Sequence, residues 1–587
     1  MNGALPRNGG DLLVEVLGSL GIDTAFGVVS VHNLPLVDAL THQLRWVPTR
    51  SEAASVNAAD GYARVRGTPG CAVTSTGTGA ANAAGALVEA LSAGSPVLHV
   101  TGQIPSEHLG AGRGVIHETR DQLGMLRSCS VWAATVATAP SADFSRAARR
   151  LGTHPRGPVS LEWPIDLQYT EPALWDHLPD DAPTSLGLDN TGGGPEPIEA
   201  AALVSGSSGA AAHHDSTNLG VATKPDDAVL DRAAELILAA ERPLVWAGGG
   251  AIGCSVAIDD LLRCTGAGLF TSNAGRGVVP ETDDRVIGNF AASATGAELL
   301  AQADVLISIG THFRSNETRS YRLALPATHI QIDIDPAAIG RAYPAEVGIV
   351  GDARTLVASL VERLSDRRCA LQPEWHESIT AAREQCRAQL RRDIGPYATI
   401  CDIMAGVLSD RSPRVRDITI PNSSWGNRLL PVIDPSTNVV PRGGGIGQAV
   451  GMSIGAAVAR ADEPTMVMVG DGGLVPQLGE LATLAQEQLP VTVVVFDDGG
   501  YGVLRNTQDR HLGRRSGVDL VTPDLAATAS AFDFGFLDVS TPAEFASAFE
   551  TATAAGCPQM IRVDCDALGP MPVPFVPPVE MPTTAGP

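Results

Sequence analysis

The stretch from Met466 to Arg505 constrains the fold of this chain more than any other. Two apolar runs, each closed by an acidic, glycine-rich loop, flank a helix-like segment; in chain order these are 466–469 and 470–473, then 478–488, then 491–496 and 497–500. Apolar residues in the middle segment recur at close to a 3.6-residue period. This order predicts a strand, a tight turn, a helix and a second strand, which together form one βαβ unit of a parallel sheet.

The two loops of this unit carry groups that suit a metal ion and an anion. Ligands of open α/β sheets bind at the carboxyl ends of the strands, and both loops follow a strand there. Asp471 and Asp498 offer carboxylate oxygens, which hard divalent cations prefer. Gly472 and Gly473 leave backbone N–H groups open to an anion. The pattern predicts Mg²⁺ held between the loops above a diphosphate; the alternative is a glycine-rich turn that binds no ligand.

The same residues resemble a known motif. Gly470-Asp471-Gly472, followed after 24 residues (473 to 496) by the pair Asp497-Asp498, is similar to the thiamine diphosphate motif. The family usually carries Asn at the second position of that pair, and Asp498 still offers a ligand oxygen. The resemblance implies that the metal ligands are the side chains of Asp471 and Asp498 and the main-chain carbonyl of Gly500.

Length and composition indicate a large globular protein. The chain has 587 residues, 44% of them hydrophobic and 18% charged, which suggests three or four domains. A net charge of −24 argues against a nucleic acid or an anionic membrane as partner. The sequence contains no apolar run long enough to predict a membrane span. Nine cysteines without CxxC spacing predict reduced thiols in the cytoplasm.

Composition and periodicity divide the chain into segments. Residues 8–175, 227–360 and 396–570 each alternate helix-like and strand-like patterns and predict α/β domains. Residues 178–226 are rich in Gly, Ser and Ala and predict a flexible linker. A charged, Arg-rich helix is expected within 365–395.

Glu52 is the candidate catalytic residue of the first domain. Arg50-Ser51-Glu52-Ala53, followed by 59–64 (Ala-Asp-Gly-Tyr-Ala-Arg), resembles the pyrimidine-domain signature of the same family. That resemblance implies that Glu52 contacts the aminopyrimidine, where a carboxyl sharing a proton with the ring nitrogen drives tautomerisation by general acid–base catalysis. The alternative role for Glu52 is to stabilise a helix N-terminus.

Two histidines are candidates for the same cleft. His32 lies in the loop 27–35, where relatives often carry a Gly-x-Pro-Gly turn and this chain has Val29 and Ser30 instead. His117 lies near the position where acetolactate synthases carry a Gln. Neutral histidine suits proton transfer near pH 7. By the resemblance we expect His117 in particular to contact substrate; the alternative for both is a structural or surface histidine.

The middle domain carries a weak dinucleotide signal. Gly248 to Gly253 follows a predicted strand, but glycine turns also serve tight packing, and the acidic residue expected about 20 residues later is missing. Residues 328–336 resemble the middle domain of acetolactate synthases, of which some hold a non-redox FAD. The segment 313–316 is not the FAD-binding version, so FAD is possible but not favoured.

The third domain adds further cofactor-contact candidates. Ser423, within Asn422-Ser423-Ser424, offers a hydroxyl to the diphosphate. By resemblance to benzoylformate decarboxylase, the Gly444 carbonyl accepts a hydrogen bond from the aminopyrimidine, and Ile446 supports the bent cofactor. The alternative is a glycine turn used for helix packing. Tyr501 follows the predicted metal loop and is expected to border the substrate.

The resemblance implies a fold of two thiamin-diphosphate-binding-type parallel-sheet domains flanking a Rossmann-like middle domain. It also implies a homodimer or homotetramer, with the cofactor between the first domain of one chain and the third of another. The implied reaction is decarboxylation of a small 2-oxo acid and carboligation of the enamine to a second carbonyl, as in acetolactate synthases. The alternatives are an aryl or alkyl 2-oxo-acid decarboxylase releasing an aldehyde, a cofactor-free regulatory or scaffold paralogue, and an NAD-dependent dehydrogenase, which the missing acidic residue disfavours.

Overall fold

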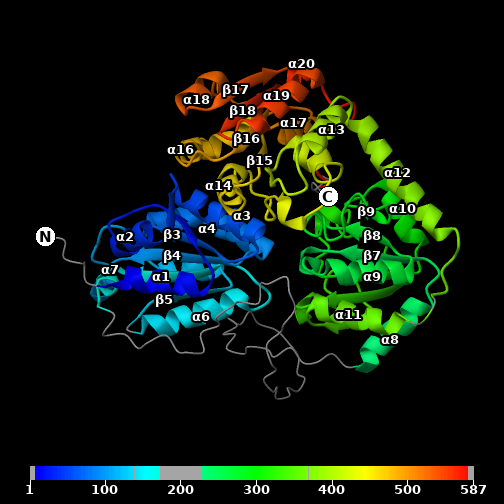
Figure 1. The fold of residues 1–587 in the computed structure, drawn as a ribbon, viewed down its shortest axis with the longest axis horizontal. Helices are drawn as coiled ribbons and strands as arrows, with labels where there is room; N and C mark the ends of the chain where they lie inside the picture. The colour runs from blue at the N-terminus through cyan, green and yellow to red at the C-terminus, as the bar shows by residue number, and fades with distance from the viewer. Residues whose placement is uncertain (1–6, 138, 172–226, 366, 368, 579–587) are drawn as a thin grey trace, which may run out of the picture. The chain divides into compact units, whose positions relative to one another are not determined.

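The computed structural model describes residues 7–578 except 138, 172–226, 366 and 368, so the predicted linker at 178–226 lies outside the described residues. The described residues contain three parallel sheets of six strands each (Figure 1). The first and third sheets belong to one compact unit, and the second sheet belongs to another. The predicted fold class, three parallel-sheet α/β domains, is confirmed.

The first sheet has the strand order β2-β1-β3-β4-β6-β5. Its central strands are buried along their whole length, as apolar runs covered by helices on both faces require. The elements of this part are α1 (Gly9–Ser19), β1 (Thr24–Gly27), α2 (Leu34–Gln43), β2 (Arg45–Pro48), α3 (Glu52–Arg66), β3 (Gly70–Thr74), α4 (Thr78–Ala93), β4 (Val97–Gln103), η1 (Ser106–His108), α5 (Gln122–Ser128), β5 (Trp132–Thr135), α6 (Pro140–Gly152), β6 (Val159–Pro164) and α7 (Ile165–Gln168).

The second sheet has the order β12-β11-β10-β7-β8-β9, which reverses between β7 and β10 as in doubly wound dinucleotide-binding folds. The strands around this point are buried throughout. Its elements, with the Arg-rich helix α12 that follows, are α8 (Asp227–Leu238), β7 (Pro243–Ala247), η3 (Gly249–Ala251), α9 (Ser255–Thr265), β8 (Gly268–Thr271), β9 (Val286–Gly288), α10 (Ala294–Gln302), β10 (Val305–Ile309), η4 (Ser315–Glu317), β11 (Thr328–Asp333), η5 (Pro336–Ala338), β12 (Val347–Val350), α11 (Ala353–Leu364) and α12 (Trp375–Ile394).

The third sheet, β14-β13-β15-β16-β18-β17, repeats the strand order of the first sheet when its strands are counted along the chain. Its elements are α13 (Tyr397–Val407), β13 (Arg414–Arg416), η6 (Asn422–Gly426), η7 (Pro435–Thr437), β14 (Asn438–Val439), α14 (Ala449–Ala459), β15 (Thr465–Gly470), α15 (Asp471–Leu474), η8 (Val475–Glu480), α16 (Leu481–Gln486), β16 (Val491–Asp497), α17 (Gly502–His511), α18 (Leu525–Ala531), β17 (Gly535–Val539), α19 (Pro542–Ala554), β18 (Gln559–Asp564) and α20 (Cys565–Leu568).

The predicted βαβ unit is present, with one difference. Strands β15 and β16 pair in parallel, as expected. The helix predicted at 478–488 instead begins at Asp471 and is divided into α15, η8 and α16, with a kink at Gln477. Pro476 at the start of η8 explains the break, because proline has no N–H to donate within a continuous helix.

Helices α3 and α14 join the first and third sheets into one unit, and they lie side by side (Figure 1). Two glycines allow this contact. A Cβ on Gly61 would lie 2.1 Å from the Met452 carbonyl oxygen, and one on Gly455 would lie 1.7 Å from the Ala58 carbonyl oxygen. Only glycine fits where two helix backbones approach this closely.

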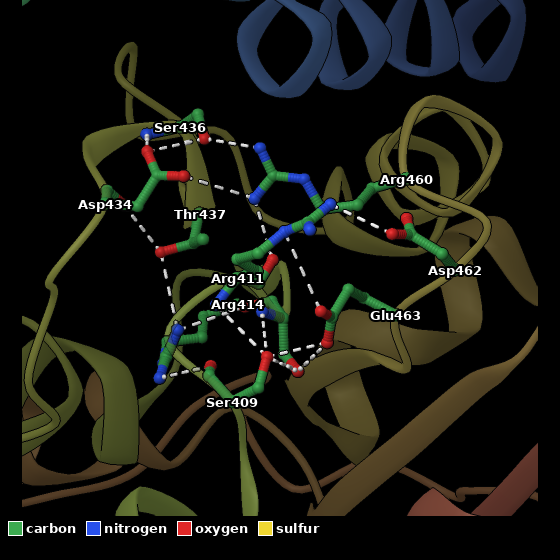
Figure 2. Close-up of polar contacts among 10 residues, drawn as sticks. Ser409, Arg411, Arg414, Asp434, Ser436, Thr437, Arg460, Asp462 and Glu463 are labelled. Carbon is green, nitrogen blue, oxygen red and sulfur yellow. Dashed lines mark hydrogen bonds and ion pairs between the residues drawn. The ribbon is translucent and has the colours of Figure 1, made fainter.

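A polar cluster closes the amino edge of the third sheet (Figure 2). Arg414, which is buried, donates to the Ser412 and Ser409 carbonyl oxygens and to the Thr437 hydroxyl at 3.0, 3.1 and 3.4 Å. Arg411 lies outside and pairs with Asp462 across an exposed surface. The buried arginine therefore connects the start of β13 to the loops on both sides, at the edge opposite the predicted cofactor loops.

We expect Arg414→Met to loosen this edge locally. The substitution removes the Arg414 donor from the buried Ser412 carbonyl, from the Thr437 hydroxyl and from the Ser409 carbonyl, which keeps the Ser412 N–H. We expect this loss to cost about 2–3 kcal/mol. Hydrogen–deuterium exchange at the amides of β13 and β15 should rise accordingly. Arg411→Met, which removes an exposed pair with Asp462 and a longer pair with Glu463 at 3.8 Å, should change the free energy of exchange by less than about 1 kcal/mol. Equal effects of the two variants would contradict the structural role of Arg414.

Candidate active site

Asp471 and Asp498 meet at the carboxyl edge of the third sheet. Asp471 is buried, its Oδ1 accepts weakly from the Asp498 backbone N–H at 3.5 Å, and its Oδ2 has no hydrogen-bond partner. Burial, followed by the charge of Asp471, raises the pKa of Asp498 to about 7. Burial also raises the pKa of Asp471. A carboxylate oxygen left without a donor beside a second carboxylate suits a bound cation, which would favour both ionised forms.

The main-chain carbonyl of Gly500 lies beside the loop that carries Asp471 and Gly472. A Cβ on Gly472 would lie 2.8 Å from the Gly500 carbonyl oxygen and 2.9 Å from the Tyr501 ring. Gly500 itself has a φ of +145°, and a Cβ there would lie 2.3 Å from the Val518 carbonyl oxygen. The structure thus brings together the three predicted metal ligands, and it sets Tyr501 over Gly472.

Two arginines give the neighbouring residues Asp497 and Asp498 different ion-pair partners. Arg562 holds Asp497, with its Nε 2.7 Å from Oδ2. Arg505 donates to the Asp498 and Gly499 carbonyl oxygens and pairs with Asp519, while its Nη1 lies 3.4 Å from the Asp498 carboxylate. Asp497 is therefore occupied by an ion pair, whereas the Asp498 carboxylate is only loosely paired and faces Asp471. The sequence analysis missed both arginines, because neither lies in a recognisable motif.

A buried carboxylate holds the predicted cofactor-supporting loop. Asp417, at the end of β13, accepts from the backbone N–H groups of Ile418, Gly447 and Ala449 at 2.6, 3.0 and 3.1 Å. Burial raises the pKa of Asp417 to about 6. The loop leads to Ile446, whose Cγ1 would lie 3.6 Å from a Cβ on Gly473. Sequence analysis missed Asp417, although an aspartate directly after a strand was the available signal.

Gly444 and Ser423 also lie in the third domain. Gly444 has a φ of +90° and open space where a side chain would be. Within the 422–424 segment, Asn422 and Ser424 use their side chains internally, donating to the carbonyl oxygens of Asp417 and Ile420. The Ser423 side chain is half-buried, and no hydrogen bond to a described residue occupies its hydroxyl.

Glu52 begins α3 but does not cap it. The cap is Ser51, whose side chain accepts from the Ala54 backbone N–H. The Glu52 carboxylate instead accepts from Asn82 Nδ2 at 3.2 Å, and a Cβ on Gly79 would lie 2.6 Å from Glu52 Oε1. Its position at the carboxyl edge of the first sheet, against the loop that follows β3, weakens the alternative that Glu52 serves only the helix terminus.

His32 and His117 form a pair at the same edge. Their Nδ1 atoms are 3.2 Å apart, so one ring donates to the other. Burial, followed by the charge of His117, lowers the pKa of His32. His117 has a φ of +68°, and its carbonyl lies where a Cβ on Gly77 would be. Gly77 ends the loop that follows β3 and Gly79 lies in the first turn of α4, so His117 contacts the end of that loop and Glu52 contacts the start of α4.

A buried network lies under this loop. Gln122 accepts from the Gly77 backbone N–H at 2.7 Å and donates to Glu162 at 3.0 Å. Glu162 also accepts from Gln103 and Thr135. Neither Gln122 nor Glu162 was a predicted site residue, because their contact with the loop depends on tertiary structure.

Within one chain, no side-chain hydrogen bond between the described residues joins the two groups of candidates. The side-chain hydrogen bonds of Glu52, His32 and His117 stay within the first domain, and the Asp471 side chain contacts its own domain. The predicted cofactor residues thus form two half-sites, one at the carboxyl edge of each of two sheets with the same strand order.

The glycines of the middle domain serve packing between two loops. The Gly250 backbone N–H donates to the Gly310 carbonyl at 3.0 Å, and a Cβ on Gly248 would lie 2.2 Å from that oxygen. The loops that follow β7 and β10 therefore contact each other directly at the point where the strand order reverses. This agrees with the tight-packing alternative for Gly248 to Gly253.

The described residues contain no group of three or more His, Cys, Asp or Glu side chains able to hold a metal. The predicted magnesium site is a different kind, since it uses two carboxylates and a main-chain carbonyl. None of the nine cysteines, all of which lie among the described residues, forms a disulfide. Across the part of the chain that the structure describes, no helix is long and apolar enough to cross a membrane.

Comparison with known families places all three domains. Residues 7–125 match the N-terminal TPP binding domain of thiamine pyrophosphate enzymes, residues 230–360 match the central domain, and residues 421–563 match the C-terminal TPP binding domain.

Similar proteins cover nearly the whole chain. A probable 2-ketoarginine decarboxylase of Pseudomonas aeruginosa is 32% identical over 85% of this chain and 83% of its own length. A probable acetolactate synthase large subunit of Methanocaldococcus jannaschii is 28% identical over 97% and 93%. A 2-hydroxyacyl-CoA lyase of Oryza sativa subsp. japonica is 29% identical over 96% of each chain. With these domains in this order, the chain belongs to the thiamine pyrophosphate enzyme family, in the group that includes the acetolactate synthases.

Proposed function

We propose that this enzyme binds thiamine diphosphate through Mg²⁺ held by Asp471, Asp498 and the Gly500 carbonyl. The observation that carries the proposal is the buried Asp471 carboxylate, whose Oδ2 has no donor and which lies beside Asp498. Two carboxylates and a carbonyl are the oxygen ligands that magnesium takes alongside substrate phosphates. The pairing of Asp497 with Arg562 leaves Asp498 as the ligand from its loop.

The neighbouring residues would hold the rest of the cofactor. The backbone N–H groups of Gly472 and Gly473 and the Ser423 hydroxyl would bind the diphosphate. The Gly444 carbonyl would accept from the aminopyrimidine, while Ile446 would support the bend and Tyr501 would border the substrate. When bound, thiamine diphosphate supplies the electron sink for cleaving the bond between a carboxylate and a carbonyl carbon.

Glu52 is the proposed proton-transfer residue. Its carboxyl would share a proton with the aminopyrimidine nitrogen, which requires hydrogen-bond distance between the two. As the resemblance to the family implies, we propose that Glu52 of one copy meets the Asp471 loop of another, since no side-chain hydrogen bond between described residues joins the two half-sites in one chain. A homodimer is the smallest assembly that does this, and a homotetramer contains two such pairs.

The proposed reaction is decarboxylation of a small 2-oxo acid followed by carboligation to a second carbonyl compound. The alternative is a decarboxylase that releases an aldehyde. The histidine pair favours that alternative, since His117 and His32 offer a proton beside Glu52. The printed name of one relative, a probable 2-ketoarginine decarboxylase, supports it too. A cytoplasmic location stays a prediction from the cysteine pattern.

Cofactor binding is the first test. Calorimetric titration should show that the wild-type chain binds thiamine diphosphate when Mg²⁺ is present and not when it is chelated. Asp471→Ala should weaken binding by about 100-fold, because it removes a charged ligand at a buried site. Asp497→Asn is the matched control from the same edge, and it should bind within about threefold of wild type because Arg562 already holds Asp497.

Absence of binding to wild-type protein with Mg²⁺ would overturn the proposal and favour the scaffold alternative. If binding is found, pyruvate, 2-oxobutyrate, benzoylformate and 2-ketoarginine should be screened for carbon dioxide release.

Mixing two inactive variants tests whether two chains build one site. Glu52→Gln and Asp471→Ala should each abolish carbon dioxide release when made alone. Co-expression in equal amounts should recover about a quarter of wild-type activity, since half of randomly formed dimers carry one intact site. Mixed dimers, isolated with two affinity tags, that remain inactive would show that the site lies within one chain.

The histidine pair should influence which product forms. His117→Gln removes the ring that bonds His32, and aldehyde release should fall about 100-fold if the pair supplies the proton. Carboligation product per carbon dioxide should then rise, measured by chromatography with an added acceptor aldehyde. His42→Gln is the control, because His42 is an exposed residue in the last turn of α2. An unchanged product ratio in His117→Gln would remove this pair from the proposal.

A further inference from the structure

A short segment of the third domain connects the Asp471 loop, the loop before α14 and the start of α3 within one chain. This segment is η8, Val475–Glu480, which follows directly from the Asp471 loop through α15. A Cβ on Gly447, in the loop that carries Ile446, would lie 2.8 Å from Pro476 Cβ. Gln477 Oε1 accepts from the Gly451 backbone N–H in the first turn of α14 at 2.7 Å. Its last residue, Glu480, reaches across to the first domain.

Glu480 binds the backbone immediately before Glu52. Its Oε1 accepts from the Arg50 backbone N–H at 3.0 Å and from the Ser51 hydroxyl at 3.2 Å. Its Oε2 accepts from the Thr483 hydroxyl at 2.8 Å. Glu480 is 2% exposed, so these donors replace water around a buried carboxyl group.

The side chain of Arg50 adds hydrogen bonds to those of its backbone N–H. Its Nη2 donates to Gln486 Oε1 at 2.8 Å, and its Nη1 donates to the Pro48 carbonyl at 2.7 Å. The chain just before α3 is thus fixed to α16 by side chains and by a backbone N–H. Ser51 is both the N-cap of α3 and a donor to Glu480, so the start of α3 cannot shift without breaking one of these bonds.

We propose that Glu480 is a positioning residue that sets where the Glu52 carboxyl lies. The proposal rests on the role given above to Glu52. Proton transfer requires Glu52 within hydrogen-bond distance of its partner, about 2.6–3.2 Å. A displacement of about 1 Å can reduce a rate about 100-fold. Glu480 provides a support from a different sheet, and that support is continuous with the metal loop.

The geometry requires the length of Glu480 rather than its charge. Both donors from the α3 start reach Oε1, the Arg50 backbone N–H is shared with Oε2 at 3.2 Å, and the Thr483 hydroxyl can accept as well as donate. Glutamine in this position keeps an acceptor for Arg50 and Ser51 and offers its NH₂ to Thr483. Aspartate keeps the charge but is one methylene shorter, so it cannot hold both ends of the contact.

The test measures the proton step without turnover. Exchange of the C2 proton of bound thiamine diphosphate for deuterium, followed by quenched NMR, reports on the aminopyrimidine and therefore on Glu52. We expect Glu480→Asp to slow exchange about 10- to 100-fold, while the cofactor Kd by calorimetry changes less than about threefold. Glu480→Gln should exchange within about threefold of wild type.

Ser51→Gly provides a second variant in case Glu480→Asp does not fold. It removes one donor to Glu480 but keeps a residue that starts helices at a cost of only a few tenths of a kcal/mol. Exchange should slow at least about threefold. Asp143→Asn is the control, because it alters another buried carboxylate that binds a backbone N–H, in the first turn of α6, and it should leave exchange unchanged.

The outcomes separate this proposal from the one on which it rests. If Glu52→Gln slows exchange but Glu480→Asp and Ser51→Gly do not, only the positioning role is overturned. If Glu480→Gln is as slow as Glu480→Asp, charge rather than reach matters, and the positioning role is again overturned. If wild-type protein binds no cofactor, or Glu52→Gln exchanges normally, the proposed function fails and this proposal with it.

Discussion

The contact between helices α3 and α14 is the constraint on which the rest of the larger unit depends. Gly61 and Gly455 let the two backbones touch, so that the first and third sheets pack through helices and not through long side chains. Any side chain at either glycine would meet a carbonyl oxygen closer than van der Waals contact allows. Because α3 begins with Glu52 and α14 follows the Gly444 loop, this contact fixes the relative orientation of two elements that carry candidate residues. The η8 contacts near the N-termini of both helices extend the same junction.

Charged neighbours give different environments to three aspartates that the sequence alone does not separate. Three aspartates gather at the carboxyl edges of β15 and β16, and mutual repulsion would raise their pKa values unless cations lie among them. Arg562 neutralises Asp497, and Arg505 binds mainly the backbone of the loop. What remains is a pair, Asp471 and Asp498, with one buried oxygen that no donor reaches. The fold thus keeps one local charge imbalance, and a divalent cation is the simplest group that removes it.

Much of the fold could be predicted from the sequence, because the signals were local. The βαβ unit, the acidic loops and the start of α3 each depend on residues within a few positions of one another, and the structure has them where they were expected. The missed residues act over long separations. Asp417 binds Gly447 and Ala449 from another strand, Gln122 reaches Gly77, and Glu480 reaches Arg50 across more than 400 positions. No periodicity or motif of one sequence marks such contacts. The prediction of one continuous helix at 478–488 was wrong for a different reason. Pro476, which breaks the helix, lies just before the predicted start and was not considered.

The first and third sheets share one strand order, and the two half-sites are built in a similar way at their carboxyl edges. In each, a buried carboxyl group at the carboxyl edge lies against a glycine of a neighbouring element: Glu52 against Gly79 in the first turn of α4, and Asp417 against Gly447 in the loop before α14. The chemistry differs because the surroundings differ. Asp417 receives three backbone N–H bonds and is fully used in holding a loop, whereas Glu52 receives a single amide bond. A carboxyl group with spare acceptor capacity at the edge of a sheet is free to exchange a proton with a ligand, and one that is saturated is not.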